Sequence, residues 1–237
     1  MKTILHKSNS RGHANHGWLD THHTFSFAQY HDAERMHFGA LRVLNDDVVE
    51  GGMGFGRHPH ENMEIISIPL SGSLEHKDSM GNTGIIRKND VQVMSAGTGV
   101  QHSEYNKDKG QKASFLQIWI FPKERDIMPR YGQQTFDPSK RVNQFQQIVG
   151  PMGNTTGVGI NQEAWLHLAS FESGHRGEYV VKQKGNGTYV FVMEGEVAIQ
   201  QQDLSKRDGL GIWEADGFSI LAKSKSEILL IEVPMDY

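Results

Sequence analysis

Short apolar runs separated by glycine turns are the feature that most restricts how this chain can fold. The runs are rich in Val, Ile and Phe, and 26 glycines punctuate them along 237 residues. No stretch keeps a helical hydrophobic period for three turns, so the pattern favours strands. Short strands between Gly turns are typical of β-sandwiches and barrels. We predict an all-β chain, with its clearest strands at 64–70, 91–94, 114–121, 189–193, 196–200, 218–222 and 227–233.

A proline-containing segment divides the chain in two. Pro122, Pro129 and Pro138 interrupt a polar, Gln-rich stretch without an alternating strand pattern. One long loop inside a single barrel is the alternative, but loops of that length are uncommon in compact domains. We therefore predict an N-terminal barrel over 1–125, a crossover linker over 126–150 and a C-terminal barrel over 151–237.

A weak internal repeat supports two related barrels. The strand, turn and strand around Gly72 resemble those around Gly195, and the tripeptide 89–91 resembles 207–209. The distance from the turn glycine to the next Asp is shorter in the second copy. We expect a shorter connecting loop there.

Composition excludes several kinds of site. The chain has no Cys, so a metal could bind only to His, Asp or Glu, and a reducing compartment is expected. A net charge of −4 gives no general attraction to nucleic acid or anionic lipid. The N-terminus lacks the apolar core of a secretory signal, and no run approaches membrane-spanning length. We expect a cytoplasmic protein without direct nucleic-acid or membrane partners.

Two pairs of candidate metal ligands stand at strand spacing. His58 and His60 are two residues apart, so both rings would project from one face of a strand. Thirteen histidines in this length produce roughly 0.7 such pairs by chance, so the pair needs context. His102 and Glu104 repeat the spacing and complete a set of three imidazoles and one carboxylate.

Each pair also lies in a longer pattern. Gly52, His58, His60, Glu64 and Gly72 resemble the first cupin motif with one extra residue before the closing Gly, and 97–106 resembles the second. Within the cupins, nearly the whole chain resembles the pirin family, and most closely the bacterial pirin-like quercetinases. The segments that carry this resemblance are 16–27 (HGWLDTHHTFSF), 42–47 (RVLNDD), 58–60 (HPH), 90–97 (DVQVMSAG) and 102–104 (HSE).

The resemblance implies a bicupin whose C-terminal barrel is abbreviated. It implies one N-terminal metal, usually iron, on His58, His60, His102 and Glu104, and flavonol 2,3-dioxygenase activity with loss of carbon monoxide. The segment 61–63 (ENM) departs from the residues that many pirins carry after the second His. This departure bears on the pocket rim and the choice of substrate.

The ligand chemistry agrees with an open metal site. Neutral imidazoles and one carboxylate suit a divalent ion such as Fe, Mn, Ni or Cu, and four protein ligands leave positions for water, substrate or dioxygen. A structural Zn site would more often close its shell with Cys. The first hypothesis is a dioxygenase that uses O2 on a flavonol, with Glu104 both ligating the metal and accepting the substrate hydroxyl proton.

Two other functions stay open at this point. One is a metal- or redox-sensing binding module that docks on a protein partner, as eukaryotic pirins are thought to do. The other is a non-redox cupin such as an isomerase. Oxygen uptake with quercetin separates the first hypothesis from the binding module.

Several conspicuous residues are expected to lie outside the site. We expect Glu64 to pack or to support a ligand, and we expect turn histidines to form hydrogen bonds or face solvent. Aromatic side chains ahead of the first motif are expected to cover apolar barrel surface. The Gly-rich run 51–56 lacks the residues of a phosphate loop and is interpreted as a bulged barrel edge. The turn histidines are His13, His16, His22 and His23, and the aromatic residues are Trp18, Phe25 and Phe27.

The second copy of the repeat is expected to hold no metal. In the first copy, His58 and His60 precede Gly72, and His102 and Glu104 follow Asp90. The same intervals, counted from Gly195 and Asp208 in the second copy, reach four residues that are not typical metal ligands. They are Val181, Gln183, Ile220 and Ala222.

Overall fold

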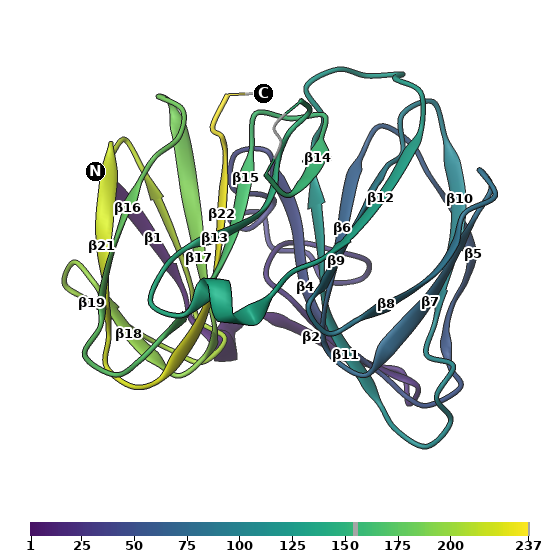
Figure 1. Ribbon diagram of the computed structural model, residues 1–237, viewed down its shortest axis with the longest axis horizontal. Coiled ribbons are helices and arrows are strands. Elements are labelled where there is room, and N and C mark those ends of the chain that lie inside the picture. Colours follow the sequence, from purple (N-terminus) through teal and green to yellow (C-terminus); the bar gives the residue numbers. More distant parts are fainter. Residues whose placement is uncertain (154–155, 237) are drawn as a thin grey trace.

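The computed structural model describes residues 1–153 and 156–236, and it is built almost entirely of β-strands (Figure 1). Two halves stand side by side, and each combines a seven-stranded sheet with a four-stranded sheet. The all-β class is confirmed, and all seven strands predicted from the sequence are present. Helical structure in the described residues is limited to the short 3-10 turns η1 (Ser8–Ser10) and η2 (Pro138–Arg141).

The N-terminal half contains both predicted ligand pairs. Its seven-stranded sheet has the spatial order β12 (Arg130–Thr135), β9 (Asp90–Ser95), β6 (Glu64–Ser71), β11 (Ala113–Ile120), β4 (Leu41–Val49), β3 (Leu19–His23) and β2 (Gly12–Asn15). Its four-stranded sheet has the order β5 (Gly54–His60), β10 (Val100–Tyr105), β7 (Ser73–Asp78) and β8 (Thr83–Arg87).

The C-terminal half repeats this order. Its seven-stranded sheet runs β1 (Lys2–His6), β20 (Gly209–Trp213), β17 (Asn186–Glu194), β22 (Ser226–Pro234), β15 (Trp165–Phe171), β13 (Gln146–Pro151) and β14 (Val158–Ile160). Its four-stranded sheet runs β16 (Arg176–Val180), β21 (Gly217–Ala222), β18 (Glu196–Ile199) and β19 (Gln202–Ser205).

The repeat is visible in the turn geometry. Gly72, between β6 and β7, has φ +68°, and Gly195, between β17 and β18, has φ +86°. A Cβ on either glycine would also meet a backbone oxygen, 2.9 Å away at Gly72 and 2.3 Å away at Gly195. Asp90 accepts a hydrogen bond from the amide of Arg87, as Asp208 does from the amide three residues before it. The two halves therefore use the same residue types, Gly and Asp, at corresponding turns.

The structure departs from the expected domain boundaries in two places. Strand β1 pairs with β20, so the first residues of the chain belong to the sheet of the C-terminal half. Strand β12, which lies inside the expected linker, pairs with β9, and β13 pairs with β15 in the other half. The segment 126–150 thus supplies β12 at the edge of one seven-stranded sheet and most of β13 between β15 and β14 in the other. Its backbone groups gain hydrogen-bond partners there despite the polar side chains.

The two halves share one apolar core. Leu116 and Ile118 of β11 pack in the same buried cluster as Leu229 and Ile231 of β22. Alternation along β11 sends the intervening side chains, Phe115, Gln117 and Trp119, to the interior of the N-terminal barrel. One element therefore joins the halves on one face and lines the barrel on the other.

The interiors of the two barrels differ in character. The C-terminal barrel is filled by one apolar cluster that includes Phe171, Tyr179, Phe218 and Ile220. The N-terminal barrel has two small apolar clusters, and polar side chains lie buried between its sheets. Buried polar groups reduce stability unless they have partners. The polar interior of the N-terminal barrel therefore indicates a functional site rather than a packed core.

Among the described residues, no helix has the length and apolar character needed to cross a bilayer.

Candidate metal centre

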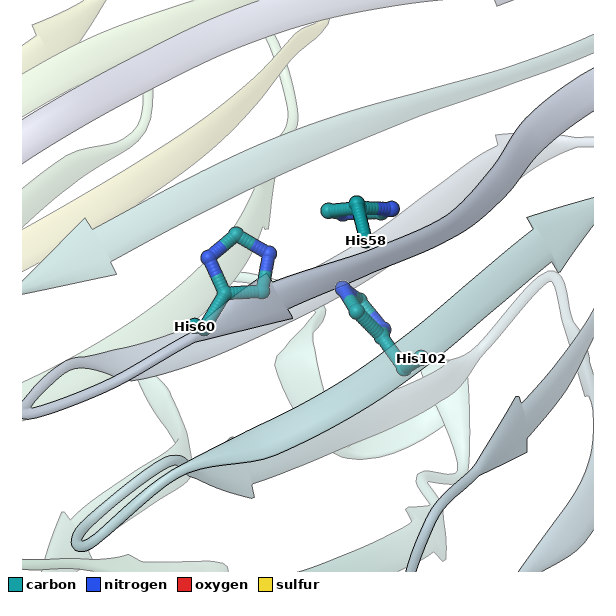
Figure 2. Close-up of side chains that lie close together, drawn as sticks. All are labelled: His58, His60 and His102. Carbon is teal, nitrogen blue, oxygen red and sulfur yellow. The ribbon is translucent and has the colours of Figure 1, made fainter.

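Three imidazoles meet between β5 and β10. His102 lies directly opposite His58 in the antiparallel pair, and the spacing of two residues brings His60 to the same face. The ring centroids are 4.4 Å apart for His58 and His102, 4.8 Å for His58 and His60, and 4.9 Å for His60 and His102 (Figure 2). One ring nitrogen from each lies within 4.8 Å of the others, which suits a shared ion.

The ring nitrogens of His102 lack ordinary partners. His102 is 1% exposed, and neither of its ring nitrogens has a hydrogen-bond partner. A buried imidazole with no partner is costly, and a bound cation would satisfy it. The Nδ1 atom of His58 lies 2.7 Å from the carbonyl oxygen of Gly56 and donates to it, which leaves Nε2 for an ion. The residues present therefore fit a metal ion.

Burial keeps the imidazoles of His60 and His102 neutral. Burial, followed by the neighbouring His58, lowers the pKa of His60 to about 4. Burial and the surrounding imidazoles lower the pKa of His102 to about 2. Neutral imidazole is the form that ligates metals, so the rings of His60 and His102 can bind an ion near neutral pH without first releasing a proton.

Glu104 belongs to an overlapping group. One of its carboxylate oxygens lies within 4.8 Å of ring nitrogens of His76 and His102. The Oε1 atom accepts a 3.0 Å hydrogen bond from Ser67 Oγ, and Oε2 accepts a 2.9 Å bond from Gln117 Nε2. Burial raises the pKa of Glu104. The structure brings the three predicted imidazoles together and links the predicted carboxylate to them through His102.

His76 is a member of the site that the sequence did not reveal. It is fully buried on β7, opposite Glu104, and its Nε2 lies 3.1 Å from Asp78 Oδ2. Its Nδ1 has no partner. An imidazole oriented by a carboxylate is a common arrangement around metals. Only the pairing of β7 with β10 brings His76 here.

A pocket of about 590 Å³ opens onto the centre. His58, His60 and Glu104 line it, whereas His102 is buried behind them. Its apolar wall includes Phe27, Phe55 and Trp119. Trp119 packs edge-on against His60, with ring centroids 4.9 Å apart, and its buried indole N–H has no partner. The volume is within the range of pockets for small molecules.

Another part of the pocket wall is polar and comes from β3 and β4. His23 Nδ1 lies 3.0 Å from Asn45 Oδ1, and Thr21 donates a hydrogen bond to Asp47. Burial, opposed by that hydrogen bond, raises the pKa of Asp47 to about 7. His23 is buried, and it contributes to the pocket.

Several expectations for the N-terminal segment are corrected by the pocket. His13, His16, His23 and Phe27 line it, although the sequence placed them outside the site. The segment 12–27 folds across the barrel as β2, β3 and the following turn, and this contact leaves no local sequence signal. Phe25 is buried in the shared core as expected.

Trp18 and Glu64 behave as the sequence predicted. Trp18 packs edge-on against Phe55, with ring centroids 5.3 Å apart. Glu64 accepts a 2.6 Å hydrogen bond from Ser95 Oγ and is 1% exposed. It belongs to none of the ligand groups found among the described residues.

The strand pairing also revises which residues of the second barrel correspond to the ligands. Tyr179 pairs with Phe218 as His58 pairs with His102, and Ile220 pairs with Ile199 as Glu104 pairs with His76. The sequence count predicted Ile220 and Ala222 on β21, whereas the strand pairing places Phe218 and Ile220 at the positions of His102 and Glu104. The two-residue difference arises because the connections between strands differ in length. The corresponding side chains are still aromatic or aliphatic, and a metal-free second barrel stays a prediction.

One of the two barrels is filled with apolar side chains, and the other, which has the same strand order, holds a cluster of three imidazoles. This arrangement defines a bicupin with a candidate metal centre. The chain belongs to the pirin family: residues 5–120 match the Pirin model and residues 147–233 match the quercetinase C-terminal cupin domain.

Individual relatives cover almost the whole chain. A quercetin 2,3-dioxygenase of Escherichia coli is 44% identical over 97% of this chain and 98% of its own length. A pirin-like protein of Caulobacter vibrioides is 36% identical over 93% of this chain and 95% of its own. The crystal structure of the bacterial pirin YhhW from Escherichia coli in complex with nickel(II) superposes with a TM-score of 0.93 at 42% identity, covering 98% of this chain and 99% of that one.

Proposed function

We propose that this protein is a metal-dependent dioxygenase that cleaves flavonols with O2 and releases carbon monoxide. The observation that carries the proposal is the three-imidazole cluster at the wall of an aromatic pocket of about 590 Å³. The similarity to a protein named quercetin 2,3-dioxygenase supports the same reaction class.

We propose His58, His60, His102 and Glu104 as the metal ligands. A bound divalent ion would supply a redox-capable centre with positions open to the pocket. Iron is the ion that the family resemblance implies, and the nickel complex of the bacterial pirin supports including nickel among the ions to be tested. Mn, Cu and Zn fit the same donor set.

The residues of this chain would perform binding and proton transfer. A planar, multi-ring substrate fits between the aromatic side chains of the pocket, which include Phe27, Phe55 and Trp119. Glu104 would accept the proton of the flavonol hydroxyl, which makes the ring electron-rich before it meets oxygen. Its hydrogen bonds from Ser67 and Gln117 hold the carboxylate in place for that transfer.

Oxygen uptake tests the proposal. Protein reconstituted separately with Fe, Ni, Mn, Cu or Zn is mixed with quercetin in an oxygen electrode, and carbon monoxide is measured in the same samples. At least one redox-active metal form should consume oxygen and release an equal amount of carbon monoxide. If no form exceeds the rate of the free metal with any flavonol tested, the protein is not a flavonol dioxygenase and the binding-module hypothesis takes its place.

A further inference from the structure

A second group of ligating side chains lies on the hairpin formed by β2 and β3. His13 of β2 and His22 of β3 are direct cross-strand partners, and Asp20 is two residues before His22 on the same strand. These relationships place all three side chains on one face of the hairpin. The other face of the hairpin carries Thr21 and His23, which also line the pocket. The group shares no residue with the imidazole cluster or the Glu104 group described above.

The donor atoms already lie close together. His13 Nε2 is 2.8 Å from Asp20 Oδ1, and His22 Nδ1 is 3.9 Å from the same oxygen. The two imidazole rings stack with centroids 4.4 Å apart. Ligand atoms around an ion at 2.0–2.1 Å lie roughly 2.9–3.4 Å from each other. Small side-chain rotations would bring these three atoms to that spacing.

The charge and exposure of the group suit a cation that exchanges with solvent. The side chains of His13, Asp20 and His22 are 50%, 44% and 39% exposed. Burial, followed by Arg11 and His13, lowers the pKa of His22, so its ring is neutral and free to ligate. Arg11 is the nearby cation, and its charge is balanced by Asp46 at 3.6 Å.

We propose that His13, Asp20 and His22 form a second metal site, which binds a borderline divalent ion such as Zn²⁺. Two imidazoles and one carboxylate are a donor set that such ions prefer, and the exposed face leaves room for water ligands. His13 also lines the pocket, so the bound ion would stand beside the substrate cavity. The site does not depend on the dioxygenase proposal.

Stoichiometric titration of untagged protein, already loaded with one metal per chain, tests this site. Zn²⁺ is added under equilibrium dialysis, and we expect uptake of a second equivalent. His22→Phe keeps a ring stacked on His13 but removes the ligand nitrogen, and Asp20→Asn keeps an acceptor for His13 but removes the charge. Each should weaken the second binding step at least about tenfold, since even loss of a supporting contact costs about that much at metal sites. His31→Ala, an exposed histidine outside the group, should leave it unchanged.

Independent readouts make the test specific. Cu²⁺ bound as the second ion should show an electron paramagnetic resonance spectrum split by two nitrogens, which His22→Phe reduces to one. The His60→Ala variant should still take up this ion, because the two sites share no residue. The proposal is overturned if the loaded protein takes up no second equivalent, if His22→Phe and Asp20→Asn bind it as wild type does, or if His60→Ala abolishes it.

Discussion

Glu104 and His76 face each other across the β7–β10 strand pair, and both are buried, with 1% and 0% exposure. A buried carboxylate beside a buried imidazole whose Nδ1 is unpaired places two polar groups where the second barrel has Ile220 and Ile199. The pair marks the point at which the two otherwise similar barrels diverge in chemistry.

Replacing His60 with Ala should yield folded protein with little bound metal. Two remaining imidazoles and a carboxylate held by other hydrogen bonds compete poorly with buffer for a divalent ion. Metal analysis and a thermal melt of the purified variant measure both effects. The exposed His31→Ala serves as the control. Full metal occupancy in His60→Ala would show that the ligand assignment is wrong.

Glu104→Gln should reduce turnover with quercetin by about 10²–10⁴ when rates are normalised to bound metal. The Gln side chain still offers an oxygen to the ion but cannot accept a proton. Glu64→Gln is the matched control, because Glu64 is equally buried but lies outside the ligand groups. If Glu104→Gln keeps the wild-type rate per metal, the substrate proton leaves by another route.

Asp47→Asn should change how stability depends on pH. The folded protein raises the pKa of Asp47 from 3.8 to about 7 through burial, so it retains a proton that the unfolded chain has already released. The stabilisation is complete below about pH 4 and is lost as the pH rises through 7.

Chemical unfolding of metal-free protein at pH 5 and pH 8 measures this effect. The free energy of unfolding of Asp47→Asn minus that of wild type should be larger at pH 8 than at pH 5, by an amount on the order of a few kcal/mol. The exposed Asp216→Asn should show no such gain. A constant difference between Asp47→Asn and wild type at both pH values would contradict the prediction.

Tyr179→Phe should destabilise the C-terminal barrel without changing metal content. The Tyr179 hydroxyl donates a 2.8 Å hydrogen bond to Glu232, whose other contacts are backbone amides and the Asn186 side chain. Removing one donor from a buried carboxylate costs about 1–3 kcal/mol. Denaturant titration and metal analysis of the variant and of the less buried Tyr105→Phe test this. A loss of metal in Tyr179→Phe would argue against a metal-free second barrel.

The sequence by itself determined the β class, the two-barrel repeat and the two pairs of candidate metal ligands. These are local properties: glycine turns, strand alternation and the i, i+2 spacing of His58 with His60 and of His102 with Glu104 are all read within a few residues. The turn glycines Gly72 and Gly195 were recognisable because positive φ and close backbone contact leave few alternatives to Gly.

Only the tertiary structure decided which distant strands supply the rest. His76 reaches the centre through the register of β7 on β10, and the segment with Thr21 and His23 joins the pocket because β3 pairs with β4. Strand β1 joins the far sheet although it opens the chain. Strand pairing depends on hydrogen bonds and shared cores formed across the whole fold, and loop length shifts the register between repeats. The alternation of side chains within a strand does not specify which distant strand it pairs with, so this pairing could not be predicted from the sequence.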